Sequence, residues 1–333
     1  MKSLFKYLIT LIFLFLGISS PINAQKSIQE LAELKDKKWD KLVKSHKSGL
    51  NNVYAVEGLI SIDLLDKANL PNPKTAGVIT FQLWDESVTK SSKAGNYTYY
   101  EKNFLTPSGS NVISNKLIET ILPEIKNNFK QANINLMEPK EFASSEDKQK
   151  IYNEGGERVE LSGLLKAFSG GLLARLQGKR DGQGTLSADG YAFYPITASI
   201  IATDFKAPST IGLITEELEL DASLIISVKV SIEKGGKSLM FRGMELALIG
   251  PINDNKSINY SGRIGAKTMN KYRDGVLYSV AYFGVDDIQI AKINKKSGEI
   301  KEWYLDGFEK MSGRLTTDLL YGLEKFKNLD KKK

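Results

Sequence analysis

The chain has 333 residues, enough for one large domain or two ordinary ones, with 41% hydrophobic residues, 26% charged residues and a formal net charge of +7. It contains no cysteine, which excludes disulfides and a lipidated amino-terminal cysteine, so the fold rests on its core alone. Its single histidine, His46, argues against a Ser-His-Asp triad, histidine acid–base catalysis and a histidine-rich metal site.

Residues 1–24 have the pattern of a secretory signal peptide. Lys2 and Lys6 precede an apolar run from Tyr7 to Leu16, and Ala24 ends a small-residue cleavage site. An uncleaved anchor helix is the alternative, but the run is short for a membrane span. No second long apolar run follows, so we expect an exported, soluble mature chain, either periplasmic or extracellular.

Residues 25–73 are interpreted as a helical arm or cap. Positions 27–48 are highly charged and helix-like, with Trp39 among the apolar residues that would seat them on the body. Two prolines in Leu70–Pro73 then break the pattern, because neither a helix nor a central strand accommodates them. We therefore place a domain boundary there and a single α/β domain over residues 74–330.

The domain begins with a predicted strand and a long polar segment. The strand covers Gly77–Trp84, with Ile79, Phe81 and Leu83 expected on one face. Residues Asp85–Pro107 follow, and several aromatic residues lie there among serines and lysines: Tyr97, Tyr99, Tyr100 and Phe104. A segment of this length is functional, mobile or a small hairpin of its own.

An amphipathic helix is predicted over Ser110–Ala132, because apolar residues recur at helical spacing. Ser110 is the expected N-cap, and Pro123 is expected to kink the helix or split it in two. A short strand, Ile134–Met137, follows. A further helix is expected from Ser144 or Ser145 to Asn153, where Gly155-Gly156 would end it.

The glycine-containing segment Leu161–Leu176 is helix-like. A core helix with close backbone packing is the favoured interpretation, and a helix lying on a membrane surface is the alternative. A flexible loop is expected over Gly178–Gly190 and a strand over Tyr191–Ala202.

The strongest pattern in the sequence is a helix from Leu213 followed by a β-hairpin over residues 222–250. Even positions from Leu224 to Ile232 are apolar and odd positions are mostly polar, which is the period of a strand. A two-residue turn at Gly235-Gly236 would set the register of the second strand. The expected cross-strand pairs are Ile232–Leu239, Val230–Phe241, Val228–Gly243 and Leu224–Ala247.

The same register places Glu245 opposite Ile226 on the apolar face. A buried carboxylate is costly unless it is paired. The strand is therefore expected to bulge, or the sheet edge to be open, at this point. Gly250-Pro251 would end the strand, because proline cannot donate to the ladder.

The remainder of the chain is predicted to be loop-rich at residues 253–271, with strands at 276–285 and 288–293. A turn at 295–300 and a mainly helical segment at 302–327 complete the domain. The positive charge comes mostly from lysine, scattered except at Lys331–Lys333. This is typical of a solvated surface, so we expect no nucleic-acid site.

Three kinds of short motif resemble sites of known chemistry but match them only in part. Gly236-Lys237-Ser238 resembles the end of a phosphate-binding loop but sits in the predicted β-turn. Gly182-Gln-Gly184 is half of a dinucleotide fingerprint, with Ser187 where the third glycine belongs. Ser87–Lys90 and Ser145–Lys148 match Ser-x-x-Lys without its companion motifs. We expect no bound cofactor, nucleotide or metal, and assign no catalytic residue.

Two acidic pairs, Asp85-Glu86 and Asp286-Asp287, follow predicted strands. Together they would hold a cation or act as a carboxylate pair, whereas the simpler interpretation is solvated loop acids. Asn96–Thr98 is a glycosylation sequon that matters only in a host that glycosylates there.

The order of the predicted elements resembles a known family. It begins with strand Gly77–Trp84, helix Ser110–Ala132, strand Ile134–Met137 and a further helix. The run Glu216–Val228 follows, with the sequence Glu-Glu-Leu-Glu-Leu-Asp-Ala-Ser-Leu-Ile-Ile-Ser-Val. It is similar to the anticodon-binding-like α/β domain of bacterial envelope proteins such as CsgG, the amino-terminal domain of TolB, and LpoB. The resemblance covers about residues 75–250. The chain departs from CsgG and LpoB in lacking a lipid-anchor cysteine, and from TolB in lacking a propeller.

The resemblance implies a periplasmic protein that works by contact with envelope partners rather than by catalysis. The expected contact surfaces are the segments Asp85–Pro107 and Gly163–Gly190. A peripheral membrane contact and any oligomeric state stay open. The alternative is a secreted carboxylate-dependent hydrolase that uses Asp85, Glu86, Asp286 or Asp287.

Overall fold

The computed structural model describes the following residues: 27–45, 60–62, 73–87, 90–94, 97–101, 105–159, 186–198, 207–233, 235–252, 258–264, 267–273, 275–294 and 299–328. The expectations for the leader 1–24, for His46 and for the segment 161–176 lie outside these residues. Within them, no helix is long and apolar enough to cross a membrane.

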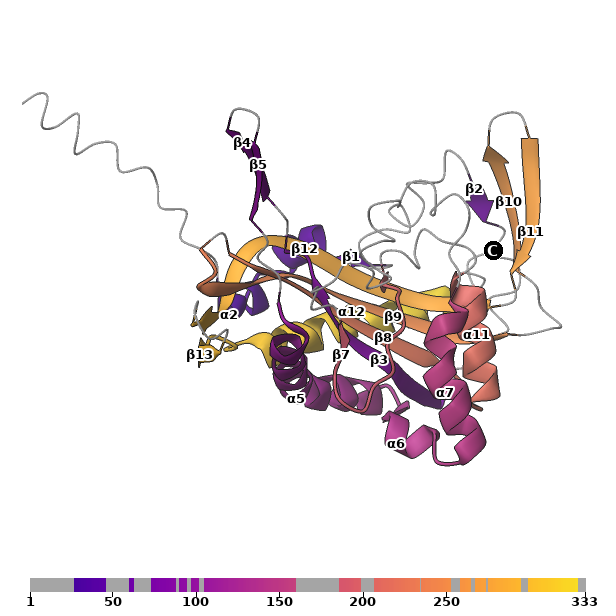
Figure 1. Ribbon diagram of the computed structural model, residues 1–333. Coiled ribbons are helices and arrows are strands. Elements are labelled where there is room, and N and C mark those ends of the chain that lie inside the picture. The colour runs from indigo at the N-terminus through magenta and orange to yellow at the C-terminus, as the bar shows by residue number, and fades with distance from the viewer. Residues whose placement is uncertain are drawn as a thin grey trace, which may run out of the picture.

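A curled sheet of eight strands forms the centre of the molecule (Figure 1). Its principal strands, in spatial order, are β1 (Lys44–Ser45), β12 (Gly275–Ile293), β9 (Ser238–Ile252), β8 (Ser223–Ile232), β3 (Thr75–Asp85) and β6 (Asn135–Met137). The strand β7 (Leu186–Ser187) adds to β3, and β13 (Ile300–Trp303) adds to β12. Because β3 is parallel to β6 and β8 while the other pairs are antiparallel, the predicted α/β class with a mixed sheet is confirmed.

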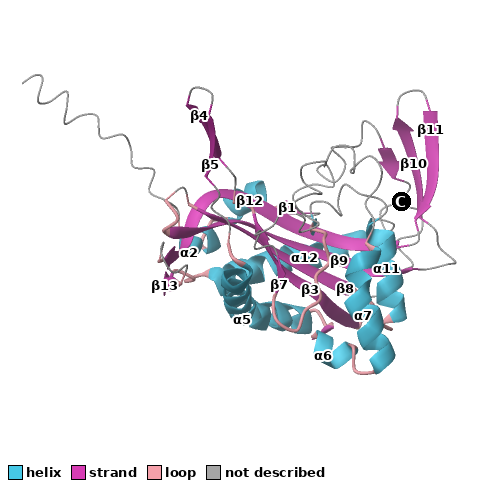
Figure 2. Ribbon diagram, viewed as in Figure 1, coloured by secondary structure: helices cyan, strands magenta, loops and turns pink. Residues whose placement is uncertain are grey.

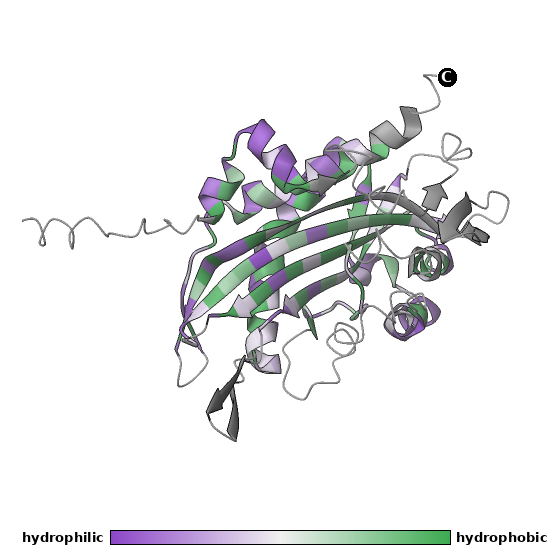
Figure 3. Cartoon of the chain, turned by 90° about the horizontal axis from the view of Figure 1, so that it is seen from above, coloured by the Kyte–Doolittle hydropathy of each residue, from purple (hydrophilic) through white to green (hydrophobic). Residues whose placement is uncertain are grey.

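Helices cover both faces of this sheet (Figure 2). One face carries α5 (Pro107–Gln131) and α12 (Phe308–Asn328), with α2 (Ile28–Ala32) and α3 (Asp36–Leu42) beside them. The other face carries α6 (Pro139–Phe142), α7 (Glu146–Arg158) and α11 (Ala207–Glu217). Each face has its own hydrophobic core. The alternation of apolar and polar residues that builds these cores appears as bands along the strands in Figure 3.

The β8–β9 hairpin has the predicted register next to its turn. Val230 pairs with Phe241, and Ile232 pairs with Leu239. The turn itself differs from the prediction, because the Gly236 N–H donates to the Glu233 carbonyl (2.8 Å). Gly236 therefore follows the turn in a left-handed conformation (φ 68°) rather than sharing its centre with Gly235.

Beyond Val230 the predicted pairs are wrong, because the register shifts by one residue between Lys229 and Val230. The expected bulge is therefore present, and it moves Glu245 from Ile226 to Ser227 on the opposite face of the sheet. The alternative of an open sheet edge is wrong, since β12 pairs with β9 at Glu245. The corrected pairs are Val228 with Met244 and Leu224 with Leu248.

Gly243 explains where the bulge occurs. A Cβ at this position would lie 2.3 Å from the carbonyl oxygen of Phe283 on β12, closer than any real side chain approaches backbone. The two strands therefore approach closely here only because Gly243 has no side chain.

A second register shift corrects the prediction for β3. The pairing with β8 slips between Val78 and Thr80. Phe81 and Leu83 then belong to the core under α5 and α12, whereas Ile79 belongs to the core under α7 and α11. The three residues do not share one face as expected, and both faces of the strand are buried.

The helix α5 begins earlier than predicted. Its N-cap is Thr106, whose hydroxyl accepts a hydrogen bond from Gly109 N (3.1 Å), and Ser110 is a buried residue inside the helix. Pro123 does not split it, since one helix continues from Pro107 to Gln131.

Ser145 caps α7 as predicted, but Gly155-Gly156 does not end it. A Cβ at Gly155 would lie 2.4 Å from the Tyr194 hydroxyl, and one at Gly156 would lie 2.1 Å from the Phe193 carbonyl. These glycines let α7 approach the segment 191–197 closely. That segment was expected to be a strand but is irregular.

Two smaller sheets extend from the main one. The strands β4 (Lys90–Ala94) and β5 (Tyr97–Glu101) form a hairpin between β3 and α5, which is one of the outcomes expected for residues 85–107. The strands β10 (Ile258–Ile264) and β11 (Lys267–Arg273), with β2 (Ile60–Ile62), form a three-stranded sheet where a loop was expected. The two strands expected at 276–293 form one strand, β12, with register shifts between Gly284 and Ile288.

Candidate interaction surface

Three buried polar residues lie side by side on the sheet face that α11 covers. Gln82 on β3, Ser227 on β8 and Glu245 on β9 are cross-strand neighbours, and all three are buried. Gln82 Nε2 donates to Ser227 Oγ (3.1 Å) and also to the Ile196 carbonyl. The polar residues at odd positions of β8 therefore face partners within the protein and are not simply exposed to solvent.

Lys229 and Glu245 form an ion pair at the bulge. Glu245 is 1% exposed and the Lys229 side chain is 22% exposed. Without the bulge this carboxylate would lie among the apolar residues under α12, where no lysine of β8 could reach it. The shift by one residue thus supplies the counter-charge that a buried carboxylate requires. Burial, and secondarily the charge of Glu245, raises the pKa of the neighbouring Tyr282.

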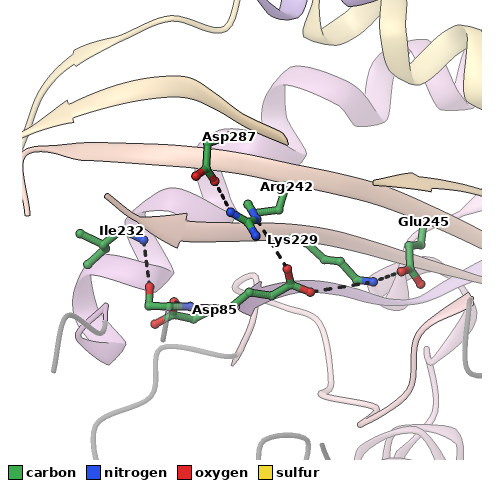
Figure 4. Close-up of polar contacts among 8 residues, drawn as sticks. Asp85, Lys229, Ile232, Arg242, Glu245 and Asp287 are labelled. Atoms are coloured by element: carbon green, nitrogen blue, oxygen red, sulfur yellow. Dashed lines mark hydrogen bonds and ion pairs between the residues drawn. The ribbon is translucent and has the colours of Figure 1, made fainter. Parts of the chain in front are cut away.

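The ion pair continues outward into a charged strip, defined by Glu86, Lys229, Arg242, Glu245 and Asp287 (Figure 4). Glu86 contacts both cations, with 4.0 Å from its carboxylate to Lys229 Nζ and 4.0 Å to Arg242 Nε. Arg242 also binds Asp287 through Nη1. Exposure increases along the strip from 1% at Glu245 to 40% at Glu86 and 50% at Asp287.

The structure brings one member of each predicted acidic pair into this strip. Glu86 and Asp287 lie on either side of the Arg242 guanidinium, which forms an ion pair with each. A carboxylate pair for hydrolysis needs two acids facing a substrate, with one of them able to hold a proton. Here a cation occupies the space between them. Asp286 is exposed at the surface.

Asp85 has a structural role, not the cation-binding, catalytic or solvated role considered from the sequence. It is 5% exposed, and its two carboxylate oxygens accept hydrogen bonds from Ser87 N (3.0 Å) and Leu105 N (2.9 Å). Ser87 Oγ in turn accepts a hydrogen bond from Ile232 N at the end of β8 (2.9 Å). One buried carboxylate therefore clamps both ends of the segment that carries the β4–β5 hairpin.

Two of the other motifs have structural roles, whereas Gly182–Gly184 lies outside the described residues. Ser145 caps α7, and Lys148 pairs with Glu219 (2.6 Å), so this Ser-x-x-Lys match is a helix start. Gly236–Ser238 lies at the end of the β8–β9 hairpin, which is no phosphate-binding loop. Among the described residues, no three acidic or histidine side chains are arranged to hold a metal ion.

Three tyrosines that the sequence did not single out anchor the irregular segment 191–197. The Tyr152 hydroxyl donates to the Ile79 carbonyl (2.9 Å) and accepts from Ala192 N (2.7 Å), and Tyr194 donates to the Tyr152 carbonyl (2.9 Å). Tyr191 donates to Glu138 (3.3 Å). Burial raises the pKa of all three phenols. No local pattern could have shown these bonds, because they join residues at least 40 positions apart.

Lys126 lies next to this cluster and binds the carboxylate of Glu138 (2.6 Å). Desolvation alone would raise the pKa of Glu138, but the hydrogen bond and the charge of Lys126, together with Lys140 and Tyr191, hold it below its ordinary value. The cluster is thus a structural clamp with its polar groups satisfied.

Comparison with protein-family models, with curated proteins and with solved structures finds no match to this chain.

Proposed function

We propose that this chain is an exported component of the bacterial envelope that acts by contact with partner proteins. The observation that carries the proposal is the clamp at Asp85. A buried, doubly hydrogen-bonded carboxylate fixes both ends of the segment bearing the β4–β5 hairpin to the end of β3. A hairpin that projects from a fixed base is suited to partner contact, since less of its freedom is lost on binding.

The composition of the hairpin supports this role. Its second strand, Tyr97–Glu101, contains three tyrosines, and tyrosine is enriched among residues that anchor interfaces. The adjacent charged strip would add complementarity with a polar partner surface, which affects specificity and association rate more than affinity.

A carboxylate-dependent hydrolase has less support. Asp85 is occupied by two backbone amides, and Glu86 and Asp287 are both bound to Arg242. Arg242 lies between Glu86 and Asp287, so these two acids do not face a shared substrate site as a hydrolytic pair would require.

Export and the likeness to envelope domains are part of the proposal. The basic and apolar pattern of residues 1–24 supports cleavage after Ala24. The parallel arrangement of β6, β3 and β8 with covering helices fits the α/β pattern by which the chain resembles the CsgG, TolB and LpoB domains. Intact mass of the exported fraction tests the first point, and a mature chain that still begins at Met1 would contradict it.

Excision of the hairpin tests the function. Removing residues 90–101 while keeping Asp85, Ser87 and Leu105 leaves the clamp in place. We expect this variant to lose co-purification with envelope partners while its melting transition stays unchanged. Excision of the other hairpin, residues 258–273, is the matched control and should keep the partners. Retention of the same partners by both variants would overturn the proposal.

A further inference from the structure

The first described segment of the chain is packed against the last described helix. Residues 27–45 form α2, α3 and β1, and five of their apolar side chains are almost completely buried: Ile28, Leu31, Ala32, Trp39 and Val43. The helices α2 and α12 are in contact, and β1 pairs with β12 at Tyr282 and Ala281. The segment interpreted as an arm thus contributes to the main core.

A buried polar contact fixes this packing. Trp39 Nε1 donates to Asp318 Oδ2 (2.6 Å), and both side chains are less than 4% exposed. The guanidinium of Arg314 lies 4.4 Å from the centre of the Trp39 ring, in a cation–π contact. The same guanidinium donates to the carbonyls of Ala32 (3.1 Å) and Leu34 (2.5 Å), where α2 ends.

The fit at the start of α12 is equally close. Gly307 has φ 84°, and a Cβ there would lie 2.6 Å from Gln29 Cα. The backbone of α2 therefore rests directly on the turn that begins α12. Both partners of this contact must be in their final positions before it can form.

Neither α2 nor α3 would be stable without these contacts. They contain 5 and 7 residues, far below the length at which an isolated helix is stable in water. Their polar partners in α12 lie almost 280 positions away in the chain. Contacts of such separation carry a large loop-closure cost until other contacts have brought the two ends of the chain together, which favours their forming late.

We infer that residues 27–45 are a latch that docks last and completes the fold only when α12 is in place. If the chain is exported, as proposed above, the residues next to the leader remain without helical structure until the whole chain has been made. The leader is thereby kept away from the folding core during synthesis and export. The latch thus extends the proposed function to the route by which the chain reaches the envelope.

Pulse-labelled hydrogen exchange during refolding of the chain purified from its host tests the order of events. Amides of residues 28–43 should gain protection at least tenfold more slowly than amides of β3, β8 and β9. Protection of residues 28–43 at the same time as these strands, or before them, would overturn the inference.

The variant Trp39→Phe tests whether the latch is a separate unit in the native state. It removes the donor to Asp318 but keeps a ring against Arg314 and Phe283. Native-state exchange at residues 28–43 should rise by tenfold or more, with less than a twofold change in β8 and β9. The control Tyr152→Phe, which loses a buried hydroxyl on the opposite face, should give no such selective rise. An equal rise at the latch and the sheet in Trp39→Phe would contradict a separate unit.

Different experimental results would reject the latch and the export proposal. Late protection of residues 28–43 in a chain that keeps its leader would preserve the latch and reject export. Early protection in a chain cleaved after Ala24 would do the reverse.

Discussion

The two faces of the central sheet are stabilised in different ways. Under α5 and α12, β8 presents Leu224, Ile226, Val228 and Val230 to a continuous apolar core, where another apolar side chain of similar volume would be tolerated. At the far end of the other face, Ser227 and Lys229 face polar neighbours, and each group depends on a particular partner. The first face depends on apolar burial. The second depends on specific polar pairs, and one of them, Lys229–Glu245, forms because the strands bulge at Gly243.

Truncating a large residue on the apolar face should have the greatest effect. Phe241 is fully buried and makes edge-to-face contacts with Phe283 and Phe308, at 6.0 and 5.1 Å between ring centres. We expect Phe241→Ala to lower the free energy of unfolding by about 3–5 kcal/mol, measured by urea denaturation. A loss below about 1 kcal/mol would show that this face is not the main source of stability.

The polar end of the other face, where Lys229 pairs with Glu245, should respond to loss of one charge nearly as strongly. Lys229→Met leaves Glu245 buried without its main counter-charge, and we expect a loss of about 3 kcal/mol in the same assay. The matched control is the double variant Lys229→Met, Glu245→Leu, which removes both charges and should recover most of the loss. If the double variant were as unstable as the sum of the two single variants, the two charges would have no coupling energy, and our interpretation that Lys229 is the counter-charge of Glu245 would be wrong.

High pH should weaken the tyrosine cluster on the sheet face that α7 and α11 cover. The folded pKa values of Tyr152 and Tyr194 are raised above the ordinary tyrosine value, chiefly by burial. Their stabilising contribution is therefore complete below about pH 10 and is lost as pH rises through the folded pKa values, by up to about 1.4 kcal/mol per pH unit for each phenol. Urea midpoints measured from pH 8 to 11 should fall in the wild type and fall less steeply in Tyr152→Phe. Identical slopes would contradict the assignment.

The smallest effect is expected at the exposed end of the charged strip. Arg242 and Asp287 are 38% and 50% exposed, so Arg242→Gln should cost less than about 1 kcal/mol. The difference from wild type should shrink further in high salt, because solvent-exposed charges are screened. A loss as large as that of Lys229→Met would erase the distinction between the buried and exposed parts of the strip.

The apolar face could be predicted from the sequence because its signal is local. The alternation from Leu224 to Ile232 gave strand β8, and Val230 was correctly paired with Phe241. The error began at Gly243, where the close approach of β12 sets the bulge. Since β12 is a different strand, nothing in the hairpin's own residues shows how near it comes.

For the same reason, the polar contacts of the other face could mostly not be predicted from the sequence. Asp85 and Glu86 were singled out, yet Asp85 binds Leu105 N, twenty positions away, and Glu86 binds cations from β8 and β9. The segment 191–197 has the composition of a strand, but side chains such as Tyr152 and Gln82 bind its backbone in place of a neighbouring strand. Such long-range polar contacts leave no periodic trace in the sequence.

Cross-linking in the native host, followed by mass spectrometry, tests the central claim most directly. The account predicts cross-links from residues 90–101 to envelope proteins, and their loss in Asp85→Ala, which releases both ends of the hairpin segment while the sheet stays folded. Recovery of the monomer alone, together with a hydrolytic activity that Asp85→Asn abolishes, would contradict partner binding and favour an enzyme.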